Sequence, residues 1–167
     1  CQAAKANPLY LAYKRAEAEN RDLTEADFEP MEAGETLASA IRIGNPVSLP
    51  KAVRALVACR GIVEQATESE LADAVARADR TGMFNCPHTG VALACLEKLV
   101  VAKTIQRHER VVVVSTAHGL KFTEFKSAYH RQALEFDSTY ANVPFEMGSD
   151  PDTVLGEIHR ALDKRGH

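Results

Sequence analysis

The run of four consecutive valines at 111–114 constrains the fold more than any other feature of this sequence. β-Branched residues favour extended backbone, and an apolar run without alternation is typical of a strand buried on both faces. The run ends in Ser115 and Thr116, and ligands of open α/β sheets bind beyond the carboxyl ends of parallel strands. The sequence therefore predicts a buried strand over 111–115 with two hydroxyls at a binding edge. Ser115 and Thr116 also suit a cap for the following segment, and this alternative stays open.

Helix signals alternate with short apolar segments along the rest of the chain. The first predicted helix begins at Asn7-Pro8, the second runs from Ser48 to Cys59 with Gly61 as its C-terminal cap, and the third follows a capping box at Thr67–Glu70. Further helices are predicted at about 89–101, at 119–133 and from Asp150-Pro151 to about 164. The predicted short strands start at Ile62-Val63 and Met83-Phe84. Short strands that alternate with helices are typical of an α/β fold with a parallel sheet.

The composition fits one globular domain over 1–167, of which 46% is hydrophobic and 26% is charged. We expect an irregular acidic insertion at about 22–35, where Pro30 and Gly34 break regular structure. A net charge of −3 with scattered basic residues excludes a basic nucleic-acid or membrane surface. The longest apolar runs fall well short of the ~20 residues that cross a bilayer. We predict no nucleic-acid partner and no membrane partner.

The cysteine pattern argues against metal binding and disulfides. Cys1, Cys59, Cys86 and Cys95 form no Cys-x-x-Cys pair, which suggests a reducing compartment. Cys59 and Cys95 lie on apolar stretches and are expected to be small core residues. Cys86 lies close to His88, but a metal site normally needs three or four ligands, so we predict none.

Other common catalytic motifs are absent from the sequence. Its glycines are too widely separated for a phosphate-binding loop, and there is no Gly-x-Ser-x-Gly elbow. His88, His118, His130 and His108 are candidates for chemistry, although a lone histidine more often has a structural role. Lys121 could serve as an amine nucleophile only if it were desolvated, and its polar neighbours argue against that.

Four segments of the chain together resemble one enzyme family. They are CQAAKANPLY at 1–10, TLASAIRIGNPV at 36–47, TGMFNCPHTG at 81–90 and STAHGLKF at 115–122. In this order and at this spacing they resemble the C-terminal part of threonine synthase, most of all its plant-type branch. The resemblance covers most of the chain and is loosest near the C-terminus.

The resemblance implies a cofactor and a fold. Threonine synthase is a lyase of amino-acid biosynthesis that uses pyridoxal 5'-phosphate (PLP) and converts O-phosphohomoserine and water into threonine and phosphate. Its fold, shared with the tryptophan synthase β chain, is a three-layer αβα arrangement with a mostly parallel sheet. The resemblance implies that Thr116 hydrogen-bonds the pyridine nitrogen of PLP beside Ser115, and that Ala38 and Ala40 let the ring lie close to the backbone. A packed small-residue helix is the alternative for these alanines.

The resemblance also implies that the catalytic lysine lies outside this chain. The family's Schiff-base lysine belongs to a Ser-x-Lys-Asp-Arg motif, and its phosphate-binding loop precedes the matched region; neither motif occurs here. The chain starts at Cys1 and enters an apolar segment directly. We therefore expect a C-terminal fragment, incomplete at the N-terminus of its PLP domain and inactive alone. The family suggests a cytoplasmic protein, or a plastid protein in a plant or alga, and homodimers are common in it.

Two other functions stay open. A threonine or serine dehydratase of the same fold shares the hydroxyl at the ring nitrogen. A non-catalytic module that kept half of the fold would also lack the lysine and the phosphate loop.

Overall fold

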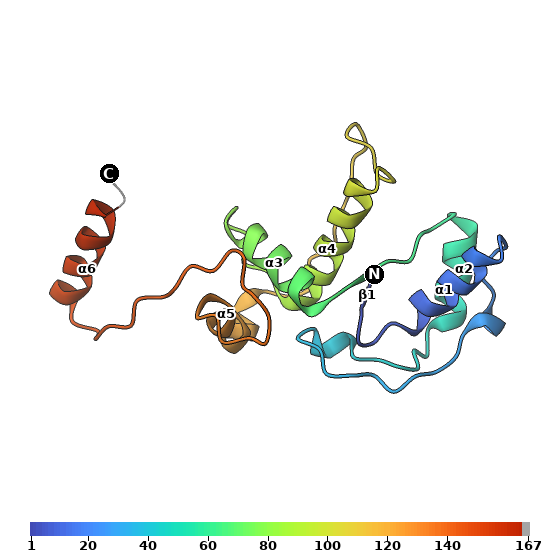
Figure 1. Ribbon diagram of the computed structural model, residues 1–167, viewed down its shortest axis with the longest axis horizontal. Coiled ribbons are helices and arrows are strands. Elements are labelled where there is room, and N and C mark those ends of the chain that lie inside the picture. The colour runs from blue at the N-terminus through green and yellow to red at the C-terminus, as the bar shows by residue number, and fades with distance from the viewer. Residues whose placement is uncertain (165–167) are drawn as a thin grey trace.

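Two short parallel strands join the start of the chain to its middle (Figure 1). The computed structural model describes residues 1–164. In it β1 (Gln2–Ala3) pairs with β2 (Gln65–Ala66), and Gln2 lies opposite Gln65. A small parallel sheet combined with helices is compatible with an α/β fold.

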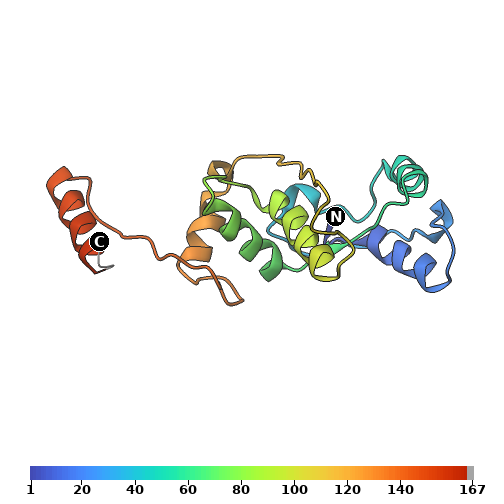
Figure 2. The ribbon, with the colours of Figure 1, turned by 90° about the horizontal axis from the view of Figure 1, so that it is seen from above.

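Helices α3 (Glu68–Asp79) and α4 (Pro87–Val101) pack against each other beside the sheet (Figures 1 and 2). Gly90 permits the close approach, because a Cβ atom at this position would clash with Val75 Cγ2 and would lie 2.5 Å from the Leu71 carbonyl oxygen. The buried cluster around this contact comprises Ala3, Ala38, Ala66, Leu71, Ala72, Ala74, Ala76, Val91, Ala94, Cys95 and Tyr129. Small side chains dominate it, so the stability of this core depends on close backbone packing.

Helices α1 (Pro8–Ala18) and α2 (Leu49–Ala58) form a second packing unit at one end of the molecule (Figure 2). Their shared buried cluster comprises Ala12, Ala16, Leu23 and Val53. The connection between the two helices contains only two 3-10 turns, η1 (Glu25–Asp27) and η2 (Ser39–Ile41). The acidic stretch at 22–35 lies in this irregular connection.

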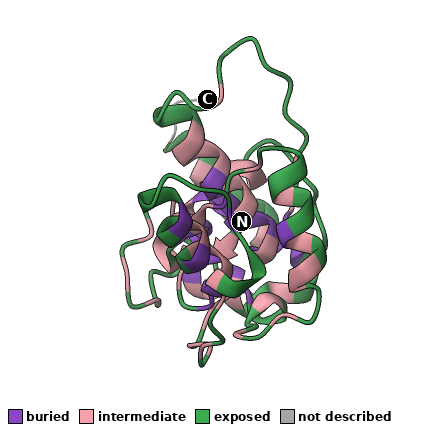
Figure 3. Cartoon of the chain, turned by 90° about the vertical axis from the view of Figure 1, so that its right-hand side faces the viewer, coloured by how far each residue is buried: buried purple, intermediate pink, exposed green. Residues whose placement is uncertain are grey.

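The chain continues from the centre to a detached final helix. The 3-10 turn η3 (Gly119–Phe122) leads into α5 (Thr123–His130), which docks on α3 where the buried Tyr129 hydroxyl donates to Asp73 Oδ1 at 2.6 Å. Helix α6 (Pro151–Asp163) lies at the opposite end from α1, beyond an extended segment (Figure 1). None of its residues is fully buried, and Figure 3 shows the buried residues gathered at the centre of the molecule.

Two predicted helix caps are confirmed. Thr67 Oγ1 accepts from the Glu70 backbone N–H at 3.3 Å, while Glu70 Oε2 accepts from the Thr67 N–H at 2.8 Å. Asp150 Oδ2 accepts from the Thr153 N–H at 2.9 Å at the start of α6. These bonds satisfy amides that have no partner within their helices.

Three other caps differ from the prediction. Arg60, with φ of 49°, occupies the left-handed position after α2, and Gly61 follows it and donates its N–H to the Leu56 carbonyl at 2.7 Å. Neither Asn7 nor Ser48 makes a side-chain capping bond. The side-chain amide of Asn7 instead donates to the side chain of Gln65 in β2.

The predicted strand at 111–115 is wrong. These residues form neither helix nor strand, and Val112 and Val114 are 90% and 71% exposed. A strand is stable only when its N–H and C=O groups bond to a neighbour. Among residues 1–164 no segment pairs with the valine run, so its β-propensity alone does not produce a strand.

The two other predicted strands are also revised. The strand expected at Ile62-Val63 forms slightly later, as β2. Met83-Phe84 forms no strand, and a single antiparallel bridge joins Asn85 to His118 beyond it.

The predictions for the two cysteines expected in the core have different outcomes. Cys95 is fully buried, as predicted, but the prediction for Cys59 is wrong because it is exposed. Cys59 follows the last residue of α2, where the helix has already left the packed cluster.

We predict that Gly90→Ala destabilises the protein by about 1–3 kcal/mol, the usual cost of forcing a methyl group into a packed core. The added Cβ meets the Leu71 carbonyl, which is backbone and cannot rotate away. Urea denaturation of the complete natural protein measures the effect. Gly148→Ala is the matched control, because a Cβ there meets nothing within 4 Å. Equal stability of the two variants would contradict the close contact.

Candidate functional site

A cleft of about 750 Å³ lies between the valine run and α4. Its walls are mostly apolar, formed by residues 111–114 on one side and by Val91 and Leu96 of α4 on the other. Thr116 and Ala40 line the same cleft. An apolar cleft with a few convergent polar groups is the usual form of a small-molecule site.

Thr116 reaches this cleft from a network of side chains at the start of α4. Its Oγ1 lies 3.6 Å from the sulfur of Cys86, the N-cap residue of α4. Its backbone N–H donates to Thr89 Oγ1 at 3.3 Å. The hydroxyl of Thr116 therefore lies at an open cleft and contacts a buried thiol behind it.

Ser115 belongs to the same network but does not line the cleft. Its hydroxyl donates to Asn85 Oδ1 at 2.9 Å and lies 3.4 Å from Thr89 Oγ1. Asn85 and Thr89 are both buried, so these bonds satisfy polar groups that water does not reach. Ser115 and Thr116 thus share Thr89 as a neighbour at the start of α4.

The two alanines implied by the resemblance occupy different places. Ala40 is exposed at the cleft, and its backbone N–H donates to His88 Nε2 at 2.9 Å. Ala38 is fully buried in the main core and does not line the cleft. His88 also packs against Phe122 in a T-shaped arrangement with 5.2 Å between the ring centroids, so it joins two segments of the cleft wall.

Cys86 is the site residue whose role the sequence did not indicate. Burial favours its neutral form, but hydrogen bonds with Thr89, Thr116 and His88 outweigh that effect and lower its pKa to about 6. The Cys-Pro-His-Thr segment contains the sequence pattern that could have indicated this role. A cap residue followed three positions later by a hydrogen-bonding side chain is a helix-start pattern, and sulfur replaces the usual oxygen here.

A buried ion pair supports the network from behind. Lys126 of α5 pairs with Asp79 of α3, and both side chains are largely buried. Asp79 also accepts the backbone N–H of Asn85 at 3.0 Å. Burial lowers the pKa of Lys126, and hydrogen bonding and charge attraction from Asp79 oppose this change. The pair thus fixes the backbone immediately before Cys86.

The other histidines that were candidates for chemistry lie outside this hydrogen-bond network. His118 caps η3 by accepting the Leu120 N–H at its Nδ1, 3.2 Å away. His130 accepts the Asn142 N–H at 3.1 Å, and His108 is exposed. All three therefore have structural or solvent-exposed positions.

Lys121 lines the cleft together with Thr116. Its side chain is exposed. A lysine that attacks a carbonyl group needs a desolvated amine, so this position does not favour Lys121 as a nucleophile.

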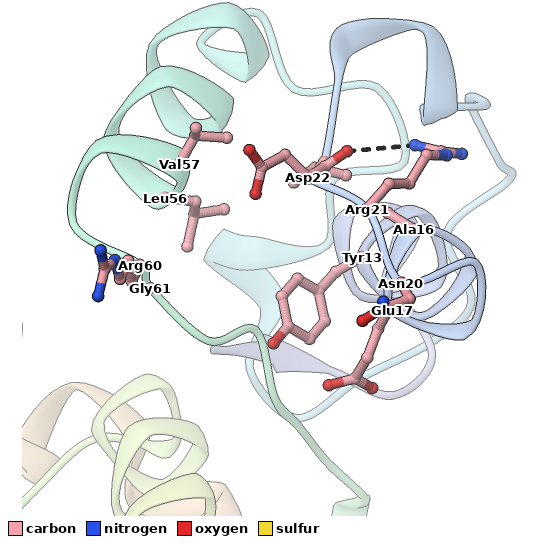
Figure 4. A pocket seen from close by; sticks show the side chains of 11 residues that line it. Tyr13, Ala16, Glu17, Asn20, Arg21, Asp22, Leu56, Val57, Arg60 and Gly61 are labelled. Carbon is pink, nitrogen blue, oxygen red and sulfur yellow. Dashed lines mark hydrogen bonds between the residues drawn. The ribbon is translucent and has the colours of Figure 1, made fainter.

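Other parts of the described chain offer less for chemistry. A hollow of about 530 Å³ lies between α1 and α2 (Figure 4), where Tyr13 points in from one helix and Leu56 from the other. Its polar side chains face solvent and form no buried network. No group of three His, Cys, Asp or Glu residues within 1–164 is placed to hold a metal ion, and no helix there is long and apolar enough to span a membrane.

We predict that Lys126→Met destabilises the protein by about 3 kcal/mol, because it leaves the buried Asp79 carboxylate without its charged partner. Thermal denaturation of the complete natural protein measures the loss. Lys51→Met, on the exposed face of α2, is the control and should change stability little. The double variant Asp79→Asn with Lys126→Met should be less destabilised than Lys126→Met alone. The opposite order would show that the pair is not coupled.

Comparison with known proteins confirms the resemblance, although no protein-family model matches the chain. The chain is 52% identical over 168 aligned residues to threonine synthase 2, chloroplastic, of Arabidopsis thaliana, which covers 98% of the chain and 31% of that relative. It is 39% identical over 122 residues to the threonine synthase of Methanocaldococcus jannaschii, covering 72% and 28%. The chain thus spans about a third of the length of these relatives. By this similarity, the chain is a homologue of the threonine synthases.

Proposed function

We propose that this chain forms one wall of the PLP site of a threonine synthase, which converts O-phosphohomoserine and water into threonine and phosphate. The observation that carries the proposal is the hydroxyl of Thr116 at the open apolar cleft. Similarity to threonine synthases along 98% of the chain supports it. The substrate would be a small molecule.

The described residues fit a flat aromatic cofactor. The cleft has apolar walls for a ring and one hydroxyl, that of Thr116, which can donate or accept one hydrogen bond. Thr116 would hold the pyridine nitrogen, Ser115 would support Thr116, and Ala40 would leave room beside the ring. Ala38 would act from the core behind Ala40. When bound, PLP supplies an electron sink for the amino-acid substrate.

A hydroxyl at the ring nitrogen differs chemically from a carboxylate. It carries no charge, so it cannot hold a proton on that nitrogen by electrostatic attraction alone. Thr116 can still fix the tilt and register of the ring, because its backbone and side chain are both bonded within the network at the start of α4.

We further propose that the lysine that binds PLP covalently lies outside this chain and that residues 1–167 alone are inactive. The exposure of Lys121 at the cleft supports this assignment. In the same proposal, residues 1–167 are the C-terminal part of the large PLP domain. The valine run would then belong to a mostly parallel sheet in a three-layer αβα fold.

The cellular setting follows the same proposal. The Arabidopsis relative is named as chloroplastic, and we propose a plastid for a plant or algal source and the cytoplasm otherwise. We also propose a homodimer, as is common in this family.

The complete natural protein should release phosphate from O-phosphohomoserine and form threonine when PLP is present. A dehydratase of the same fold would instead form a ketoacid from threonine. Measuring both products in parallel separates the two enzymes. Ketoacid formation without phosphate release would contradict the proposal in favour of the dehydratase, and the absence of both products would favour a non-catalytic module.

We predict that Thr116→Val in the complete natural protein weakens PLP binding or slows turnover by ~1–3 kcal/mol, the cost of leaving a buried polar partner unpaired. Equilibrium titration with PLP and steady-state kinetics measure the two effects. Thr104→Val makes the same change at an exposed position outside the cleft and is the control. If both variants behave like the natural protein, Thr116 is not part of the site.

A further inference from the structure

We propose that Cys86 is a positioning residue, whose buried sulfur orients the hydroxyl of Thr116 toward the cleft. The inference deepens the proposed function and rests on it, because the hydroxyl matters only if it meets the cofactor ring. Cys86 itself does not line the cleft and is fully buried, so it acts through Thr116.

The contact between sulfur and hydroxyl is held rigidly from both sides. Cys86 Sγ lies 3.6 Å from Thr116 Oγ1 and 3.3 Å from Thr89 Oγ1, and it accepts the Thr89 backbone N–H at 3.4 Å. Thr89 in turn accepts the Thr116 N–H at 3.3 Å. Three residues therefore form a closed ring of hydrogen bonds, which leaves Thr116 little rotational freedom.

The backbone reinforces this ring. The Cys86 N–H donates to the Ala117 carbonyl at 3.2 Å, which brings the residue after Thr116 against the N-cap of α4. Because Cys86 is an N-cap, its side chain is also fixed by the first turn of a helix of 15 residues. The sulfur is thus as well positioned as the helix itself.

The protonation state of the sulfur biases which way the hydroxyl proton of Thr116 points. A thiol can donate to Thr116 Oγ1, and the hydroxyl proton is then free to donate into the cleft. A thiolate can only accept, so it takes the hydroxyl proton as a hydrogen bond, and the oxygen then accepts from a donor in the cleft. Cys86 therefore sets whether Thr116 donates to the ring nitrogen or accepts from it.

The surroundings of Cys86 favour the thiolate near neutral pH. The pKa of about 6 reflects burial, which opposes ionisation, and hydrogen bonds that favour it more strongly. Titratable groups on two helices interact with the sulfur. His88 of α4 contributes one of these hydrogen bonds, and Lys126 of α5 interacts with it through charge. The charge of Lys126 is balanced by Asp79 of α3. Above about pH 6, the Thr116 hydroxyl is thus expected to donate to the sulfur, which leaves its oxygen as an acceptor at the cleft.

Three variants of the complete natural protein test the inference. Cys86→Ala removes the sulfur, and Cys86→Ser keeps a hydrogen-bonding side chain that does not ionise in this pH range. Cys95→Ala removes a fully buried thiol from the same helix, and burial raises the pKa of that thiol to about 11, so it stays neutral. The readouts are the Kd for PLP and the visible absorption band of bound PLP as a function of pH.

We expect Cys86→Ala to raise the Kd for PLP by about 3- to 10-fold, the equivalent of one hydrogen bond. We expect it also to abolish a spectral change that the natural protein shows near pH 6. Cys86→Ser should restore much of the affinity without restoring the spectral change. Cys95→Ala should retain both the affinity and the spectral change.

A second measurement needs no cofactor. In the protein without PLP, Thr116→Val should raise the pH at which Cys86 ionises, because the thiolate loses a hydrogen bond; Thr104→Val should leave it unchanged. Ultraviolet absorbance of the thiolate, with Cys86→Ala as the blank, reports this ionisation. An unchanged ionisation in Thr116→Val would overturn the contact.

The outcomes separate this inference from the proposed function. If the natural protein binds PLP but Cys86→Ala matches Cys95→Ala in affinity and in pH dependence, Cys86 does not position Thr116 and the proposed function stands. If the natural protein does not bind PLP, both proposals are overturned.

Discussion

Two backbone hydrogen bonds hold the candidate site together. Gly119 donates its N–H to the Phe84 carbonyl at 2.8 Å, and Cys86 donates to Ala117 at 3.2 Å. They bring the segment after the valine run against the start of α4. The approach at Gly119 is so close that a Cβ there would lie 2.7 Å from Phe84 Cδ1, so only glycine fits without displacement. Every contact of Thr116 with the helix start depends on this pairing.

The site combines an apolar cleft with a polar network whose inner members, Asn85, Cys86 and Thr89, are buried. Buried hydroxyl, thiol and amide groups are costly when unpaired, and here Cys86, Asn85 and Thr89 each have partners. The Lys126–Asp79 pair extends this network into the core between α3 and α5. A hydroxyl held in this way is preorganised, so little entropy is lost when a ligand meets it.

The valine run shows that a local preference for strand geometry does not by itself produce a strand. Its residues favour strand geometry, yet two of the four are more than two-thirds exposed and none is paired within the described residues. An exposed apolar segment with free backbone groups is a template for another strand. Its role in the proposed fold therefore depends on segments that would lie beside it, while the cleft that it lines is completed by α4 and by residues such as Ala40 and Phe122.

Features that depend on near neighbours along the chain could be predicted from the residues alone. The capping box at Thr67, the N-cap at Asp150 and the positions of α3 and α4 follow from residues within one helical turn, so they could be predicted. The hydroxyl of Thr116 was also found from the sequence, because it follows a distinctive apolar run. Only the tertiary structure revealed that Cys86 contacts Thr116, which lies 30 positions away, that Ala38 is buried while Ala40 lines the cleft, and that residues 111–115 have no strand partner. Strand pairing, burial and networks between elements require partners from distant parts of the chain, and a local pattern does not specify which ones meet.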